Sequence, residues 1–129
     1  GAIELVSGEV AEDIALYYME TCRHLEVEKV FLLCLDSQLR LIKECILTTG
    51  TINCSLISPR EVFLTALEAK AVHILLLHNH PSGDPSPSRQ DIEISKKVME
   101  AGEVIGIKLL DHIIIGDQTY VSLKAQKII

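Results

Sequence analysis

Two short apolar runs constrain the fold of this chain more than any other feature of its sequence. The segments VFLLCL (30–35) and VHILLLH (72–78) lack the polar alternation expected of a strand that faces water on one side. Short continuous runs of this kind predict strands that are buried on both faces. Such strands need a layer of helices on either side, so the runs predict an α/β domain with three layers.

Helical and strand patterns surround the two runs in an order that fits this architecture. The predicted helices span 9–24, 59–70 and 88–101, and the other predicted strands span 39–48, 51–57, 104–110, 111–116 and 119–123. Ser58 is expected to cap the second helix together with Glu61, and Gly102 is expected to end the third. Strand hairpins flank the alternating middle of the chain, which predicts a mixed sheet.

Composition limits the functions that the chain can serve. Its 129 residues, 48% of them hydrophobic, are enough for one domain, 1–129, with its own core. The formal charge of −6 argues against direct DNA binding through a basic face. No stretch approaches the roughly 20 apolar residues of a membrane span. A basic and apolar leader is also not visible, so a cytoplasmic location is expected. The oligomeric state cannot be read from these features.

The cysteines do not indicate a disulfide framework or a metal site of their own. They are widely spaced and form no Cys-x-x-Cys pair, so reduced thiols are expected at all four positions. These positions are Cys22, Cys34, Cys45 and Cys54.

The segment HNHPSGDPSPSRQD (78–91) carries the clearest chemical signal. His78 and His80 follow the second apolar run, and side-chain alternation in a strand would point both imidazoles to the same side. A loop rich in Pro, Ser and Gly can then fold back and bring Asp91 to them from the start of the next helix. Two imidazoles and one carboxylate suit a zinc ion and leave a fourth position for water, as in catalytic zinc sites.

Each part of this segment also has a simpler explanation. Ser88 and Asp91 have the spacing of a capping box, and an acidic side chain is favoured at a helix N-terminus. A His-x-His pair alone is common. The metal-site interpretation depends on their combination within fourteen residues of one segment.

The same segment resembles the JAMM (MPN-plus) metalloprotease signature, His-x-His-Pro, six residues, then Ser-x-x-Asp. Together with LLDHIIIG downstream, it is similar to the RadC family, historically called DNA repair proteins, from about Glu28 to the end of the chain. The resemblance implies the MPN/JAMM fold, which is cytidine-deaminase-like. It also implies zinc bound by His78, His80 and Asp91, with Ser88 helping to steady the tetrahedral intermediate.

The chain departs from these relatives in two respects. Asn79 stands between the histidines where the isopeptidase branch usually has Ser or Thr, which weakens the case for a ubiquitin-like substrate. RadC proteins usually carry an N-terminal helix-hairpin-helix region, so this sequence is expected to correspond to the C-terminal domain alone.

Hydrolysis also needs a group that takes the proton of water, and the superfamily uses a glutamate on an earlier strand. Glu44 is the best match, because it lies between Ile42 and Ile46 on one expected strand face, where a carboxylate needs a partner or a task. A pairing of Glu44 with a nearby basic residue is the simpler explanation, and Glu28 and Glu61 are the alternative bases.

A carboxylate near the end of the chain could support the metal ligands. Asp111 could accept a hydrogen bond from a zinc-bound histidine, although a role in a turn explains it equally well.

The sequence therefore predicts a zinc-dependent hydrolase of the metallopeptidase or isopeptidase type, acting on an unidentified peptide or protein. The alternative is a non-enzymatic metal-binding module that serves DNA repair or recombination through partners. A zinc deaminase would require His-x-Glu together with Pro-Cys-x-x-Cys, and the sequence contains no Pro-Cys-x-x-Cys.

Overall fold

A mixed sheet forms the middle layer of the computed structural model, which describes residues 10–23, 25–50 and 57–129. The elements in chain order are α1 (Val10–Cys22), β1 (Lys29–Leu35), β2 (Leu41–Thr49), α2 (Pro59–Glu68), β3 (His73–Asn79), α3 (Arg89–Ile105), β4 (Lys108–Ile115) and β5 (Tyr120–Ser122). The strand order is β2-β1-β3-β4-β5. Only the pairing of β3 with β4 is parallel among these five strands.

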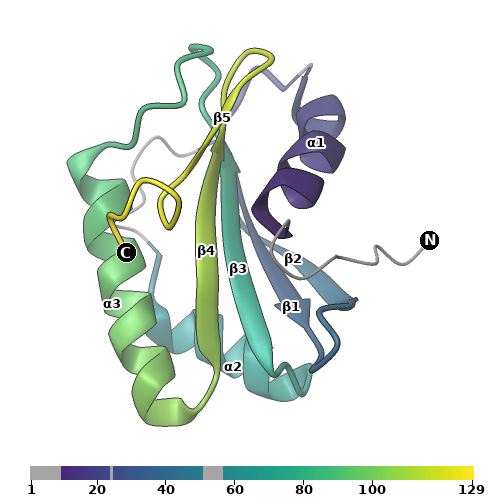
Figure 1. Ribbon diagram of the computed structural model, residues 1–129, viewed down its shortest axis with the longest axis vertical. Helices are drawn as coiled ribbons and strands as arrows, with labels where there is room; N and C mark the ends of the chain where they lie inside the picture. The colour runs from purple at the N-terminus through teal and green to yellow at the C-terminus, as the bar shows by residue number, and fades with distance from the viewer. Residues whose placement is uncertain (1–9, 24, 51–56) are drawn as a thin grey trace.

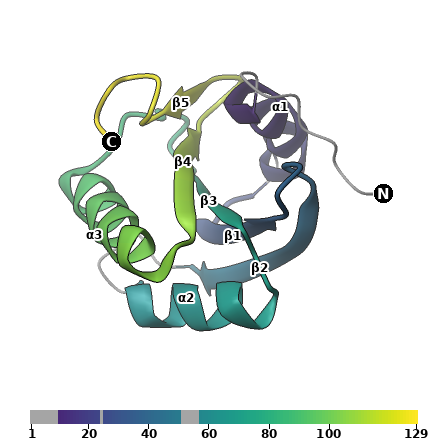
Figure 2. The same ribbon diagram turned by 60° about the horizontal axis from the view of Figure 1, so that its bottom comes forward.

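Helices cover both faces of the sheet, as the apolar runs predicted. Helix α1 lies on one face, and α2 and α3 lie on the other (Figure 1; Figure 2). Side chains of the central strand alternate between the two layers. Ile74 and Leu76 pack toward α2 and α3, whereas Leu75 and Leu77 pack toward α1. All four are fully buried, which explains why the run has no polar positions. The three-layer α/β prediction is confirmed.

The end of α3 differs from the expectation. The helix continues through Gly102 and ends at Gly106, which has a left-handed φ of 91° and donates its N–H to the Gly102 carbonyl. Val104 and Ile105 therefore belong to the helix. The two strands predicted at 104–110 and 111–116 are wrong, because Lys108–Ile115 forms a single strand.

The two predicted helix caps also have different outcomes. Ser58 lies at the N-cap of α2 but makes no capping bond with its side chain, so the capping box with Glu61 is wrong. Ser88 and Asp91 form a complete capping box at the start of α3.

Other expectations concern regions outside the site. The strand predicted at 51–57 falls mainly on residues that the structure does not describe, and Ile57 itself lies outside any strand. Cys22, Cys34 and Cys45 are free thiols, and Cys54 lies outside the described residues. Within the described ranges, none of the helices has the length and apolar character needed to cross a membrane.

Gly102 provides a test of the packing between α3 and the start of β4. A Cβ atom at this position would lie 2.2 Å from the carbonyl oxygen of Ile107 and 3.3 Å from Phe63. Gly102→Ala is expected to lower the free energy of unfolding by about 1–3 kcal/mol, as in other overpacked interiors. Denaturant unfolding would measure it, with the exposed Glu103→Ala as control. Equal stability of the two variants would contradict this packing.

Candidate metal centre

Two histidines and one aspartate meet where β3 ends and α3 begins. His78 is the penultimate residue of β3 and is fully buried, and His80 follows immediately beyond the strand. Asp91 lies in the first turn of α3 and is also buried. This position is the carboxyl end of the parallel pair β3–β4, where open α/β sheets commonly bind ligands.

The side-chain atoms of these residues converge on one point. The Nε2 atoms of His78 and His80 are 3.0 Å apart. Asp91 places Oδ1 3.3 Å from Nε2 of His78 and Oδ2 3.3 Å from Nε2 of His80. Ligands at 2.0–2.1 Å from a tetrahedral zinc ion are separated by about 3.3–3.4 Å. The three side chains therefore have nearly the spacing of three ligands of one ion.

Glu28 lies on the same side of the sheet, immediately before β1. Its Oε1 is 3.9 Å from Nε2 of His78. One ligand atom from each of Glu28, His78 and His80 lies within 4.8 Å of the others, a cluster that could hold a metal ion. Asp91 approaches the imidazoles more closely than Glu28 does, so Asp91 fits better as the third ligand. The longer separation of Glu28 leaves room for a water molecule between it and an ion.

The pKa values of the two carboxylates in the site are shifted in opposite directions. Burial would raise the pKa of Asp91, but its contacts with His78 and His80 outweigh burial and hold that pKa well below its usual range. Hydrogen bonding to Asp91 raises the pKa of His80. Burial raises the pKa of Glu28, although His78 and His80 oppose the rise. Asp91 therefore stays anionic, whereas Glu28 takes up a proton more readily, as a general base must.

The charge of the site favours a divalent cation. Asp91 and Glu28 are both nearly buried, with 3% and 7% of their side chains exposed. A cation bound beside these two carboxylates would offset the cost of burying their negative charge in a protein interior.

Backbone contacts hold the loop that carries His80. Its Nδ1 lies 2.9 Å from the carbonyl oxygen of Asp84, which can only accept, so Nδ1 donates and Nε2 is left to face Asp91. The His80 N–H donates to the Ile115 carbonyl, and the Asp117 N–H donates to the Gly83 carbonyl. The turn between β4 and β5 thus fixes the loop between β3 and α3.

Ser88 lies beside the cluster and has a structural task. Its Oγ accepts the N–H of Asp91 at 3.1 Å, and Oδ2 of Asp91 accepts the N–H of Ser88 at 2.8 Å. The capping box therefore holds the Asp91 carboxylate in place. A catalytic role of Ser88 stays a prediction.

Glu44 does not belong to this site, and its assignment as the base is corrected. Glu44 is paired with Leu33, whose side chain packs on the face covered by α1, whereas His78 is paired with Val30, which packs on the opposite face. The two positions are also three residues, or about 10 Å, apart along β1. Glu44 accepts a hydrogen bond from the Tyr18 hydroxyl of α1.

The predicted role of Asp111 is likewise corrected, because the neighbouring residue contacts the site. Asp111 accepts hydrogen bonds from Ser122 and from the backbone N–H groups of His112 and Lys124, which fasten the segment after β5. Nε2 of His112 lies 2.7 Å from Nδ1 of His78. Complete burial lowers the pKa of His112 well below its usual value, and the neighbouring His78 adds to this effect.

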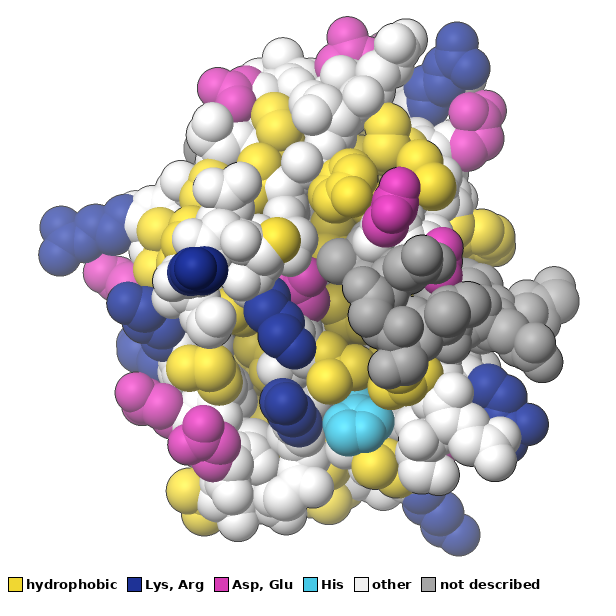
Figure 3. Space-filling model, viewed as in Figure 1, with side chains coloured by type: hydrophobic (Ala, Val, Ile, Leu, Met, Phe, Trp, Pro, Cys, Tyr) yellow, Lys and Arg dark blue, Asp and Glu magenta, His cyan; other side chains and the backbone are white. Residues whose placement is uncertain are grey.

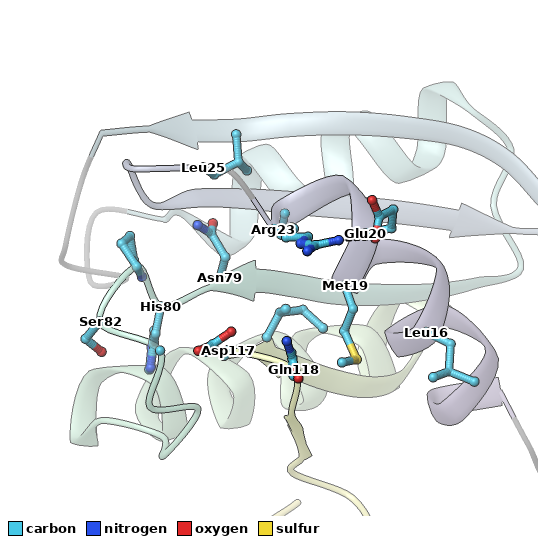
Figure 4. A pocket seen from close by; sticks show the side chains of 15 residues that line it. Leu16, Met19, Glu20, Arg23, Leu25, Asn79, His80, Ser82, Asp117 and Gln118 are labelled. Atoms are coloured by element: carbon cyan, nitrogen blue, oxygen red, sulfur yellow. Dashed lines mark ion pairs between the residues drawn. The ribbon is translucent and has the colours of Figure 1, made fainter.

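A groove of about 620 Å³ opens beside His80. Figure 4 shows Leu16 and Met19 of α1, with Arg23 just after this helix, on one side of the groove. They face His80 and Ser82 of the loop after β3 and Asp117 of the β4–β5 turn. The groove therefore combines apolar walls with charged and polar groups next to a candidate metal ligand.

Comparison with known proteins agrees with this geometry. The family model described as the RadC-like JAB domain matches residues 9–128. The chain belongs to this family. Curated proteins named UPF0758 protein, from Bacillus cereus and Bacillus anthracis, are 50% identical to it over 113 residues. The match covers 88% of this chain and 50% of each relative, so the chain spans about half their length.

In this RadC-like domain, Asn79 holds the backbone on both sides of Glu28. Its Oδ1 accepts the N–H of Lys29 at 2.8 Å, and its Nδ2 donates to the carbonyl of Val27 at 3.0 Å. A carboxamide can make both bonds because it carries a donor and an acceptor on separate atoms. The residue between the histidines therefore positions the carboxylate that faces them, a role that sequence reasoning missed.

Replacement of Asn79 tests this arrangement. Asn79→Ala removes both bonds, so hydrogen exchange at the Lys29 amide is expected to accelerate about fivefold to tenfold, the effect of roughly 1 kcal/mol. Asn79→Asp keeps the acceptor and should leave the Lys29 amide protected. The Leu32 amide, farther along β1, is the internal reference for amide exchange measured by NMR. Unchanged exchange at the Lys29 amide in Asn79→Ala would contradict a role of Asn79 in holding this backbone.

Proposed function

We propose that this domain is a zinc-dependent hydrolase of peptide or isopeptide bonds, with His78, His80 and Asp91 as zinc ligands and Glu28 as the general base. The spacing of about 3 Å among the two Nε2 atoms and the Asp91 oxygens carries this proposal. Imidazole and carboxylate ligands suit zinc, and a site with three protein ligands keeps a position open. Zinc in such a site supplies a water molecule whose pKa is lowered to near 7.

Glu28 would take the proton of that water and transfer it to the leaving amine. Its burial and raised pKa support this role, as does its position beyond the ligand distance from His78. Ser88 accepts the Asp91 N–H through Oγ, so its own proton remains for donation to the developing oxyanion.

The substrate would lie in the groove beside His80. Its lining residues include those of the segments 81–83 and 116–118 as well as apolar residues of α1 such as Leu16 and Met19. A groove that combines apolar residues with polar ones suits a polypeptide, which presents both apolar side chains and a polar main chain. We therefore infer a polypeptide substrate and not a nucleic acid.

Charge supports the same inference. The whole chain has a formal charge of −6. On the face seen in Figure 3, Lys and Arg side chains are interspersed with Asp and Glu side chains instead of forming one basic stripe. Nucleic-acid binding usually requires such a stripe. A role in DNA repair would then pass through partner proteins.

Metal content tests the site. Protein purified without chelator is expected to contain one zinc per chain by elemental analysis, and His78→Ala is expected to contain none. His73→Ala is the matched control, because His73 is at the opposite end of β3. Removal of zinc should also lower the melting temperature, since an ion at one hundred times its dissociation constant contributes about 2.7 kcal/mol. Equal metal content in all three proteins would overturn the site.

Peptide cleavage tests the chemistry. The zinc-loaded domain is incubated with a proteome-derived peptide library, and new termini are read by mass spectrometry. Glu28→Gln should retain zinc and lose at least about 100-fold of the cleavage rate, as expected when a general base is removed. Glu44→Gln, on the other face of the sheet, should retain the activity. If wild type yields no termini that Glu28→Gln lacks, the domain is a metal-binding module without hydrolase activity.

A further inference from the structure

A series of buried hydrogen-bonded side chains begins at His78, on the side of its ring that faces away from the metal cluster. Nδ1 of His78 lies 2.7 Å from Nε2 of His112, and Nδ1 of His112 contacts Oγ of Ser95. Ser95 in turn donates to the main-chain carbonyl of Asp91 at 2.7 Å. His78, His112 and Ser95 all have no exposed surface. This hydrogen-bond series begins at one candidate ligand, His78, and ends on the backbone of another, Asp91.

The donors and acceptors in this hydrogen-bond series can have only one order when His112 is neutral. The Asp91 carbonyl can only accept, so it takes the single hydroxyl proton of Ser95. Ser95 must then accept from His112, which places the proton of His112 on Nδ1. Nε2 of His112 is left as an acceptor, so His78 must donate from Nδ1. The proton of His78 is thereby kept away from Nε2.

A doubly protonated His112 would reverse this result. It would donate to Nδ1 of His78, and a neutral His78 would then carry its proton on Nε2, facing Asp91. Such an imidazole cannot bind a metal through Nε2. Complete burial of His112 disfavours its charged form.

We propose that His112, oriented by Ser95, is a positioning residue that holds His78 in the Nδ1–H tautomer and so presents the Nε2 lone pair to the metal. This inference rests on the proposed metal site. His80 reaches the same tautomer by a simpler route, through the Asp84 carbonyl, an acceptor that no side-chain replacement removes. His78 depends on a side chain, whose own orientation depends on Ser95.

The hydrogen-bond series also joins the sheet to helix α3. His112 belongs to β4 and Ser95 to α3, and their contact ends on the residue that supplies the carboxylate. The imidazole of His78 and the main chain at Asp91 are therefore fixed relative to each other by bonds that do not involve the metal. Groups that orient metal ligands in this way commonly change metal affinity by about 10–100-fold.

Two replacements of His112 separate a hydrogen-bonding role from simple packing. His112→Gln offers an amide oxygen to accept from His78 and an amide N–H to donate to Ser95. His112→Leu fills similar space and offers neither. Ser95→Ala removes only one oxygen and serves as a second test if His112→Leu fails to fold. His73→Leu is the matched control at the opposite end of β3.

The first measurement is the tautomer of His78 in the metal-free protein, from long-range proton–nitrogen NMR spectra of the imidazoles. Wild type, His73→Leu and His112→Gln are expected to show His78 protonated at Nδ1. His112→Leu is expected to shift His78 toward the Nε2–H form, and Ser95→Ala to give a mixture. A wild-type His78 protonated at Nε2, or the same tautomer in wild type and in both His112→Leu and Ser95→Ala, would overturn the inference.

The second measurement is zinc affinity, from competition with a chromophoric chelator. His112→Leu is expected to bind zinc about 10–100-fold more weakly than wild type, and His112→Gln within a few-fold of it. Wild-type affinity in both His112→Leu and Ser95→Ala would overturn the inference while leaving the metal site intact. Failure of wild type to bind zinc, with the Nδ1–H tautomer still present, would overturn the proposed function alone.

Discussion

The central position of β3 decides which side chains can meet at the candidate metal centre. Because β1 and β4 both hydrogen-bond to β3, each residue of this strand has fixed neighbours on either side. Side chains alternate between the two helical layers, so His78 faces the layer of α2 and α3. Glu28, Asp91 and His112 contact His78 on that face of the sheet, whereas Glu44 lies on the other. The chemistry of the site thus depends on which residues of this buried strand face the layer of α2 and α3.

The start of α3 adds a second constraint. Asp91 faces both imidazoles only because the capping box with Ser88 holds its carboxylate at the first turn. Successive residues of a helix are rotated by about 100°, so a helix that began one residue earlier or later would turn this carboxylate away. The geometry that caps the helix is therefore the same one in which Asp91 could serve as a metal ligand.

Sequence patterns predicted the parts of the site that lie close together in the chain. His78, His80, Ser88 and Asp91 fall within one segment, and the structure brings the side chains of His78, His80 and Asp91 within 3.3 Å of one another. The strand runs likewise predicted burial, because only a sheet covered on both faces accommodates them. Local spacing and hydrophobic period carry such information without knowledge of strand register.

Features that depend on register were predicted incorrectly. Ile42 and Ile46 suggested that Glu44 lay on a buried face, yet β2 is an edge strand in the described sheet and these isoleucines are 44% and 47% exposed. Asp111 and His112 are adjacent, and only the pairing of β4 with β3 shows which of them faces His78. Gly102 and Gly106 are both able to end a helix, and the close approach of Ile107 to Gly102 is a tertiary contact.

The wide separation of these groups in sequence affects when the centre can form during synthesis. A nascent chain that has emerged only through α3 already contains His78, His80 and Asp91, yet it lacks β4. Without β4, the parallel pairing that anchors the end of β3 and the acceptor for the His78 Nδ1 proton are both absent. A metal ion would therefore be held tightly only after β4 has been synthesised and has paired with β3.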